Sequence, residues 1–505
     1  MKKIVFIVTL TCVTLTSYGQ SIADGLRLGT TDITGTARFR ALGGAFGALG
    51  GDLSAIGVNP ASSAIFTRGT TSFTLAVDNY ESDINYFGNF NTTSDSDVSF
   101  NQAGGVFLIE ANPSSKWNKI ALAFNYDRTL NFDDDFFASG TGNISIANYF
   151  SEFAQGVPLD LLQLQSGESI SSLYQFLGEQ EGFEAQQAFL GFQSFIIDPV
   201  NLDNPNNVTY VSNISGNSFD QEYLLRSEGY NSKASFNLAA QYDERLSFGL
   251  NLNSHFADYN QSTLLVESND NEESLITNVR FENNLRTLSN GFSFQLGTIA
   301  KINQNVRVGL TYDSPTWYTI SEEASQIIST SGSDAEGEFD VLVNPRVINI
   351  FQDYELKVPG KYSGSFAYLF GKQGLISFDY SYSDFSNLTF RPTNDPFFQR
   401  QNQAIANTLK GVSTFKVGGE YRIKEWSLRA GYRFQESPYQ DGQTLGDLTG
   451  YSIGAGYNWG NVKFDFAVDR SEQDRNQSLF NTGLTSQASI ARNNTAIVGT
   501  LTFSL

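Results

Sequence analysis

The chain of 505 residues contains very little sulfur and very little imidazole: one Cys, one Met and one His. Cys12 and Met1 both lie in the first nineteen residues, so a chain processed after that segment contains neither. This excludes thiol nucleophiles, disulfides, cysteine zinc sites and iron–sulfur clusters. His255 allows at most one imidazole-dependent site, which excludes a multi-histidine metal site. We therefore expect no metal and no cofactor.

Charge is also scarce, because charged residues make up 17% of the chain whereas ordinary soluble domains carry about 25%. The formal net charge of −21 is strongly acidic. Phosphate backbones are bound by basic surfaces, so nucleic acid is not an expected partner. What the chain has in excess is aromatic residues, with 42 Phe and 23 Tyr.

The N-terminus has the form of a secretory signal peptide, residues 1–19. Lys2 and Lys3 precede an apolar run over residues 4–15, and small residues at Ser17 and Gly19 place a cleavage site before Gln20. A buried first strand or helix is the alternative. Loss of two of the 32 basic residues leaves 30 against 53 acidic ones, a formal charge of −23. No later run approaches the roughly 18 to 20 apolar residues of a spanning helix, so the exported protein is either soluble or a barrel.

From residue 117 onward, apolar residues repeatedly alternate with small or polar ones, which is typical of strands with two different faces. One example runs from Leu246 to Asn253 and another from Ile376 to Ser383. The alternation alone does not separate a soluble sandwich from a membrane barrel, because either water or lipid could cover one face.

Loop length separates these two classes. The pattern predicts fourteen strands, joined alternately by short turns and long loops, which is the arrangement of a bacterial outer-membrane barrel. The short turns are residues 112–116, 243–244, 303–304, 371–373, 423–424 and 459–460. The predicted strands are residues 70–79, 98–111, 117–130, 230–242, 245–260, 290–302, 305–318, 355–370, 374–391, 410–422, 425–436, 447–458, 461–472 and 493–505.

Two further features favour a barrel in lipid. The last strand places Ile497, Leu501 and Phe503 on one face and ends the chain at Leu505, which is similar to the C-terminal assembly signal of outer-membrane barrels. Aromatic residues fall near the predicted strand ends, where interface belts form. They are Trp117, Tyr126, Tyr242, Tyr312, Trp317, Tyr362, Tyr421, Trp426, Tyr432, Tyr457 and Trp459.

Residues 20–69 do not alternate and are rich in small residues, above all between Ala41 and Asp52. Such density lets the backbone pack closely in a confined space, as a plug inside a barrel requires. Residues 24–66, with Gly43-Gly44-Ala45 and Asn59-Pro60-Ala61, resemble the N-terminal hatch of the FadL/TodX family of outer-membrane transporters for long-chain fatty acids and aromatic hydrocarbons. The chain is similar to Bacteroidetes-type members of that family.

The resemblance implies an all-β fold: a 14-stranded antiparallel transmembrane barrel over residues 70–505, plugged by a hatch over residues 20–69. It implies passive uptake of hydrophobic compounds, with fatty acids foremost, through movement of the hatch and a lateral exit. Gly43, Gly44, Asn59, Pro60 and Ala61 are the expected gating residues. Each buried CH₂ contributes about 0.8 kcal/mol of binding free energy, so apolar sites of graded strength suffice and no catalytic residue is needed.

The capture surface is expected in the extracellular loop over residues 131–229, where residues 144–197 show apolar residues at helical spacing. These residues either contact the ligand or pack the helices on one another over the barrel mouth. The candidates for ligand contact are Phe150, Phe153, Leu161, Leu162, Phe176, Leu177, Phe189 and Phe192.

Two other sets of residues are candidates within the barrel. Gly104 and Gly105 are a plausible kink beside the lateral gap, although the family's kink lies in its third strand and these fall in the second predicted one. Arg429 and Arg433 have lumen parity, and they either bind a ligand carboxylate or form ion pairs that hold the barrel and the hatch. We expect His255 to be a solvated histidine at the barrel rim.

We expect a monomer in the outer membrane, in contact with lipid and lipopolysaccharide and with a hydrophobic small molecule as its ligand. A docking barrel of a secretion system, as in the type 9 pathway, is the main alternative, which a sealed lumen without an apolar pocket would favour. A haemin receptor is another alternative. A lipase is disfavoured because the chain has a single His to serve as the base of a catalytic triad.

Overall fold

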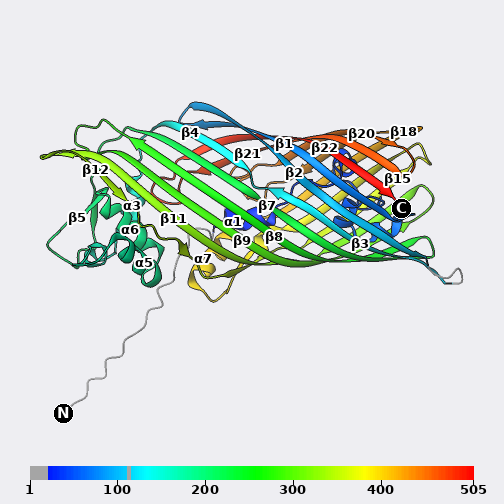
Figure 1. The fold of residues 1–505 in the computed structure, drawn as a ribbon, viewed down its shortest axis with the longest axis horizontal. Coiled ribbons are helices and arrows are strands. Elements are labelled where there is room, and N and C mark those ends of the chain that lie inside the picture. Colours follow the sequence, from blue (N-terminus) through cyan, green and yellow to red (C-terminus); the bar gives the residue numbers. More distant parts are fainter. Residues whose placement is uncertain (1–20, 111–114) are drawn as a thin grey trace, which may run out of the picture.

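The computed structural model describes residues 21–110 and 115–505. The predicted signal peptide and part of the first predicted turn lie outside these ranges. An antiparallel sheet closes on itself through the pairing of β1 with β22, forming a barrel of fourteen wall strands. Figure 1 shows a long barrel with the C-terminus at one end and a helical domain at the other. No helix in the described ranges is both long and apolar enough to cross a membrane.

Several wall strands are built from two consecutive pieces. The wall strands are, in order, β1 (Thr70–Tyr86), β2 (Asn89–Glu110), β3 (Trp117–Asn131) continued by β4 (Asp134–Gly142), β7 (Phe219–Tyr242), β8 (Leu246–Ser268), β9 (Ile276–Lys301), β10 (Val306–Asp313) continued by β11 (Thr316–Asp334), β14 (Tyr354–Val358) continued by β15 (Lys361–Leu369), β16 (Gly374–Asp384) continued by β17 (Thr389–Arg391), β18 (Gly411–Ile423), β19 (Trp426–Gln435), β20 (Leu448–Asn458), β21 (Val462–Ser478) and β22 (Gln487–Ser504).

The remaining elements lie inside the barrel or at its extracellular end. They are α1 (Ile22–Gly29), α2 (Ala37–Ala41), η1 (Ser54–Gly57), η2 (Pro60–Ile65), α3 (Ala147–Ala154), α4 (Leu159–Leu162), α5 (Ile170–Gln180), α6 (Phe183–Gln193), the β5–β6 ribbon (Ile197–Pro199 with Tyr210–Ser212), β12 (Gly337–Val343), β13 (Asn349–Ile350), η3 (Phe385–Asn387) and α7 (Pro396–Thr408).

The predicted number of wall strands is confirmed, but most of the long strands extend well beyond their predicted bounds. The predicted loop over residues 80–97 is a continuation of β1 and β2, which meet at a tight turn where Phe87 and Gly88 have φ of 50° and 84°. Outside the membrane these strands need no continuous apolar face, so the alternation that predicted them stops before they do.

Along β7, β8 and β9 the apolar residues change faces while the backbone keeps its register. In β9, Phe292 and Leu296 point outward and are about half exposed, whereas Phe281 and Val279 point inward and are buried. Odd-numbered residues face inward from Val279 to Ile299 of this strand. The outward apolar band is the surface that lipid covers, and above it the barrel has a polar outside and an apolar inside.

Candidate functional site

The N-terminal segment, residues 21–69, fills the lumen of the barrel. Two glycines that we expected to serve gating, Gly43 and Gly44, adopt φ of 60° and 72°, a backbone conformation that favours glycine. A Cβ on Gly43 would lie 3.0 Å from backbone atoms of Tyr432 in β19. The tight Gly-rich turn therefore presses its backbone directly against the wall.

Asn59-Pro60-Ala61 tie this segment to the opposite wall. The Asn59 side chain caps η2 by accepting a hydrogen bond from the Ala61 N–H at 3.1 Å. Its Nδ2 donates to the Gly47 carbonyl at 2.7 Å and to the Thr298 carbonyl of β9 at 3.0 Å. The carbonyl of Pro60 accepts a bond from the Asn237 side chain of β7 at 2.9 Å. The motif therefore caps η2 and also binds the N-terminal segment to the wall strands β7 and β9.

Glycines of the wall strands form the seat of the segment. A Cβ on Gly249 or Gly297 would collide with the Pro60 carbonyl carbon or the Asn59 side chain, at 2.2 and 2.1 Å. A Cβ on Gly309 would lie 2.2 Å from the Gly47 carbonyl oxygen. Sequence reasoning missed these wall glycines, although glycine inside a strand is a signal of close backbone approach.

Arg429 and Arg433 are both engaged in buried ion pairs. Arg429 contacts Glu420 at 2.7 Å and Asp465 at 2.6 Å. Arg433 contacts Asp469 at 2.6 Å and, in the N-terminal segment, Asp32 at 3.0 Å. These contacts favour the second of the two expected roles, holding the barrel and the segment together.

Two arginines of the segment reach the same carboxylates from within the lumen. Arg38 lies 3.0 Å from Glu420, and Arg40 lies 3.5 Å from Asp469 and 3.7 Å from Asp78. Arg40 is only 1% exposed. Because a buried cation is costly without a partner, this network specifies the position of α2 against the wall.

A cavity of about 250 Å³ lies between the N-terminal segment and the wall. Three lysines of different strands line it: Lys233 of β7, Lys361 of β15 and Lys416 of β18. Lys361 pairs with Asp313 at 3.0 Å. Lys233 and Lys416 form no close ion pair among the described residues, but each lies opposite an aspartate of the neighbouring strand, Asp127 and Asp379 respectively, that interacts with it electrostatically. Asp32, Asp127 and Asp313 also line the cavity, so its lining mixes cations and carboxylates.

His255 also lines this cavity, where its Nε2 lies 2.8 Å from the Ser293 hydroxyl. The expectation of a solvated rim histidine is wrong. β8 continues beyond His255 to Ser268, so the side chain lies well inside the barrel.

The helical domain, α3 to α6, packs its apolar residues into a closed core. Of the predicted ligand contacts, four are fully buried, three are partly buried and packed against the core, and one is 47% exposed. In that order they are Phe150, Leu162, Leu177 and Phe189; Phe153, Leu161 and Phe192; and Phe176.

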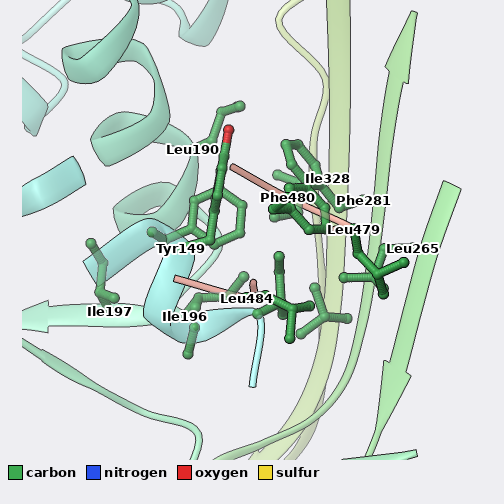
Figure 2. Packing of buried hydrophobic residues seen from close by; sticks show 14 of the residues in the cluster. Tyr149, Leu190, Ile196, Ile197, Leu265, Phe281, Ile328, Leu479, Phe480 and Leu484 are labelled. Atoms are coloured by element: carbon green, nitrogen blue, oxygen red, sulfur yellow. The ribbon is translucent and has the colours of Figure 1, made fainter. Parts of the chain in front are cut away.

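The core joins the helices to the inner face of the barrel. Figure 2 shows Tyr149 of α3 beside Phe480 and Phe281. The rings of Phe281 and Phe480 stack on each other with their centroids 6.1 Å apart. Of the two expected roles, packing of the helices accounts for these residues in this structure.

The wall is split between β2 and the third wall strand. Their ladder ends at the pair Gln102 and Asp127, and β4 beyond it pairs with β7 alone. Gly104 and Gly105 lie just below the end of the ladder and are themselves paired with β3. The third wall strand is interrupted between Asn131 and Asp134, so the discontinuity lies in the third wall strand and not at the two glycines.

Ion pairs hold β4 against β21 and β22, which lie beyond β1 and β2 in the wall. Asp134 contacts Arg475 of β21 at 2.5 Å and Arg492 of β22 at 3.5 Å. Burial alone raises the pKa of Asp134, but the two guanidinium groups outweigh it and hold the pKa below its usual range.

An acidic cleft of about 520 Å³ opens at this split. Its carboxylates come from both sides of the gap and are Asp95, Asp97, Asp133, Asp135, Glu228 and Asp258.

Comparison with known proteins points to one family. The profile described as outer membrane protein transport protein (OMPP1/FadL/TodX) matches residues 201–504. A FadL homologue from Pseudomonas aeruginosa superposes with a TM-score of 0.55 at 11% identity, covering 94% of this chain and 99% of its own. The toluene transporter TodX of P. putida superposes with a TM-score of 0.51 at 12% identity, covering 94% and 99%. At such identities the likeness shows the fold alone. No curated protein sequence matches the chain.

Proposed function

Because the chain belongs to the outer membrane protein transport family (OMPP1/FadL/TodX), we propose that it imports long-chain fatty acids by passive passage through a plugged barrel with a lateral exit. Members of the family transport hydrophobic compounds across the outer membrane, where this closed barrel resides. The fatty acid as substrate and the lateral exit are inferred from the lumen cavity and from the interrupted wall.

The observation that carries the proposal is the lumen cavity and its lysines. A fatty acid has one carboxylate head and an apolar tail, and an ammonium group without an ion-pair partner suits the head. Lys233 and Lys416 supply two such groups on the cavity wall. A neutral aromatic hydrocarbon would form no charge-assisted hydrogen bond with these ammonium groups.

The N-terminal segment is the proposed hatch. Asn59 joins the Gly47 turn to the wall strand β9 through one amide group. Movement of the segment would break these bonds together, so the amide couples the Gly-rich turn to the wall. The split beside Gly104 and Gly105 is the proposed lateral opening, because the wall there lacks the ladder bonds between β2 and β4.

The test is uptake of radiolabelled oleate by cells that carry the gene, lack it, or express a variant. We expect the deletion to abolish the specific uptake and Asn59→Ala to change its rate. Unchanged uptake in the deletion strain refutes the proposal.

A second comparison tests the substrate class. Lys416→Met should lower oleate uptake several-fold and leave toluene uptake unchanged. Lys357→Met is the matched control, since Lys357 lies on the outward face of β14, away from the lumen. Equal effects of both variants on oleate uptake would contradict binding of the carboxylate by Lys416.

Docking in a secretion system is the second candidate, favoured by the closed packing of the helical domain. Apolar side chains remain exposed at the extracellular end, with Phe195 at 47%, Leu342 at 64% and Ile350 at 81%. This candidate predicts that deletion of the gene impairs protein secretion and leaves oleate uptake intact.

A further inference from the structure

A second interruption of the wall lies between the seventh and eighth wall strands. β10 ends at Asp313 and β11 starts at Thr316, while β14 ends at Val358 and β15 starts at Lys361. Asp313 pairs with Lys361 and Thr316 pairs with Val358. The register is the same on both sides of the interruption, so Pro315 lies opposite Pro359 and Ser314 opposite Gly360.

Opposed prolines explain why the ladder stops here. Proline has no N–H to donate, and inside sheets it is confined to edges and bulges. A wall strand of a closed barrel has a neighbour on each side, so the ladder bonds are missing here although the strands stay in contact: a Cβ on Gly360 would lie 2.5 Å from the Asp313 carbonyl oxygen.

The neighbouring polar groups are satisfied away from the interruption. Ser314 donates its N–H to the Phe294 carbonyl of β9 at 2.9 Å, and its hydroxyl accepts the Phe294 N–H at 2.9 Å. The Gly360 carbonyl accepts the Ser383 hydroxyl at 3.0 Å. The wall strands therefore hold together without bonds across the interruption.

The interruption lies between the lumen cavity and the lipid side. Ser314, Thr316, Val358 and Pro359 all line the cavity. On the outside, the interruption is flanked by aromatic side chains typical of the membrane interface, Tyr362 at 64% exposure below it and Trp317 at 39% above it.

The end of α1 closes the interruption from within. A Cβ on Gly29, the last residue of α1, would lie 3.4 Å from Val358 and 3.2 Å from the ring of Phe385. Leu28 and Gly29 also line the cavity, so a displacement of α1 would clear the inner side of the interruption.

We propose that this interruption is a second lateral portal, through which the apolar part of a ligand passes between the lumen cavity and the outer leaflet when α1 moves. The proposal rests on the proposed function and names a route for it. The charges that border the portal, Asp313 and Lys361, offset each other in an ion pair, whereas the split beside β2 has six carboxylates against two arginines, an excess of negative charge that repels a fatty acid head group.

The test is a disulfide staple across the interruption. Cys12 is the chain's one cysteine and lies in the predicted signal peptide, so engineered cysteines have no competing partner. Thr316→Cys with Val358→Cys places a directly opposed pair on the cavity face beside the prolines. Thr311→Cys with Ser363→Cys is the matched control, an opposed pair of the same two wall strands within the intact ladder.

We expect the first staple to lower the initial rate of oleate uptake at least twofold under oxidising conditions, with recovery after reduction, and the control staple to have no effect. An unchanged rate with the first staple formed overturns the portal. Failure of the unstapled parent to take up oleate instead overturns the proposed function, so the two failures are distinguishable.

A second measurement needs no disulfide staple and does not depend on how much ligand passes through each opening of the wall. Irradiation of the parent with a diazirine-labelled palmitate should label peptides containing residues 314–316 and 358–360. Pro315→Thr with Pro359→Val restores both donors and should remove this label. Labelling confined to peptides of β2 and β3 contradicts the proposal.

Discussion

The membrane half and the extracellular half of the barrel use the same strands in opposite ways. In β8, Phe248 and Leu252 face outward near the periplasmic end, while Leu265 faces inward under the helical domain. The inward positions of the membrane half are polar, as at Asn251 and Asn253. Lipid replaces water outside the first half, and the helical domain replaces water inside the second, so each half has its apolar residues on a different face.

The change of apolar face along each of these strands therefore marks the membrane boundary. No bulge is recorded in the pairing of β8 with β9, which runs from Leu246 to Ser268. The change of face is therefore a property of the side chains and not of the backbone.

The largest effect is expected in the extracellular core. Phe281→Ala removes a fully buried ring that contacts Tyr149, Phe150 and Phe480. We expect a loss of about 3 to 5 kcal/mol in the free energy of unfolding, from lost burial and the cavity that remains. Urea titration of protein refolded in detergent micelles measures it. Arg280→Ala, at the exposed neighbouring position, should stay within about 0.5 kcal/mol.

In the membrane half of the same strand, the outward face is the one that should be sensitive to substitution. Leu296→Arg puts a charge on the lipid face, at a cost of about 2 to 4 kcal/mol near the bilayer midplane. The same titration in lipid vesicles measures it. Leu296→Ala keeps an apolar side chain at the same position, and the prediction fails if the arginine is tolerated as well as this alanine.

A smaller effect is expected where the N-terminal segment meets the wall. Gly309→Val forces a side chain against the Gly47 carbonyl, and overpacking of this kind costs about 1 to 3 kcal/mol. We expect the segment to loosen, which would appear as faster hydrogen exchange of residues 43–51. Gly364→Val is the control, because a Cβ there meets only Leu310 at 3.9 Å. Equal exchange rates in the two variants would contradict the claim that wall glycines are needed for close contact with the N-terminal segment.

The smallest effect concerns the ion pairs of β4 and their pH dependence. Because the pKa of Asp134 is lowered, its contribution of about 1 kcal/mol is fully present above the ordinary pKa of about 4 and is lost as the pH falls through the lowered value. Protection of residues 134–142 from exchange should be constant from pH 8 to 5 and fall in stronger acid. Asp134→Asn should reduce protection at neutral pH and remove this acid dependence, and an unaltered acid profile would argue against the pair.

Sequence reasoning predicted the number of wall strands and their antiparallel order, because alternation and loop length are local properties. It predicted short bounds for the long strands, since their extracellular parts alternate in a different sense. It identified Asn59-Pro60-Ala61, yet the partners of Asn59 on β9 lie more than two hundred residues away and could not be read from the motif.

The residues with two possible roles needed the tertiary structure. Arg433 has lumen parity from its strand alone, but only the position of the N-terminal segment brings Asp32 to it. The helical spacing of Phe150 and Phe189 is the same for a ligand groove and for a closed core. The prolines at 315 and 359 were visible as exceptions within strands, and only the register shows that they face each other.

The sequence by itself therefore determined the class of fold and the membrane setting, through the alternation and the sorted loops. The tertiary structure decided which lumen charges are paired, which lysines are not, and where the wall is interrupted. The physical reason is that a residue's face follows from its place in one strand, whereas its partners depend on closure of the barrel and on the segment folded inside it.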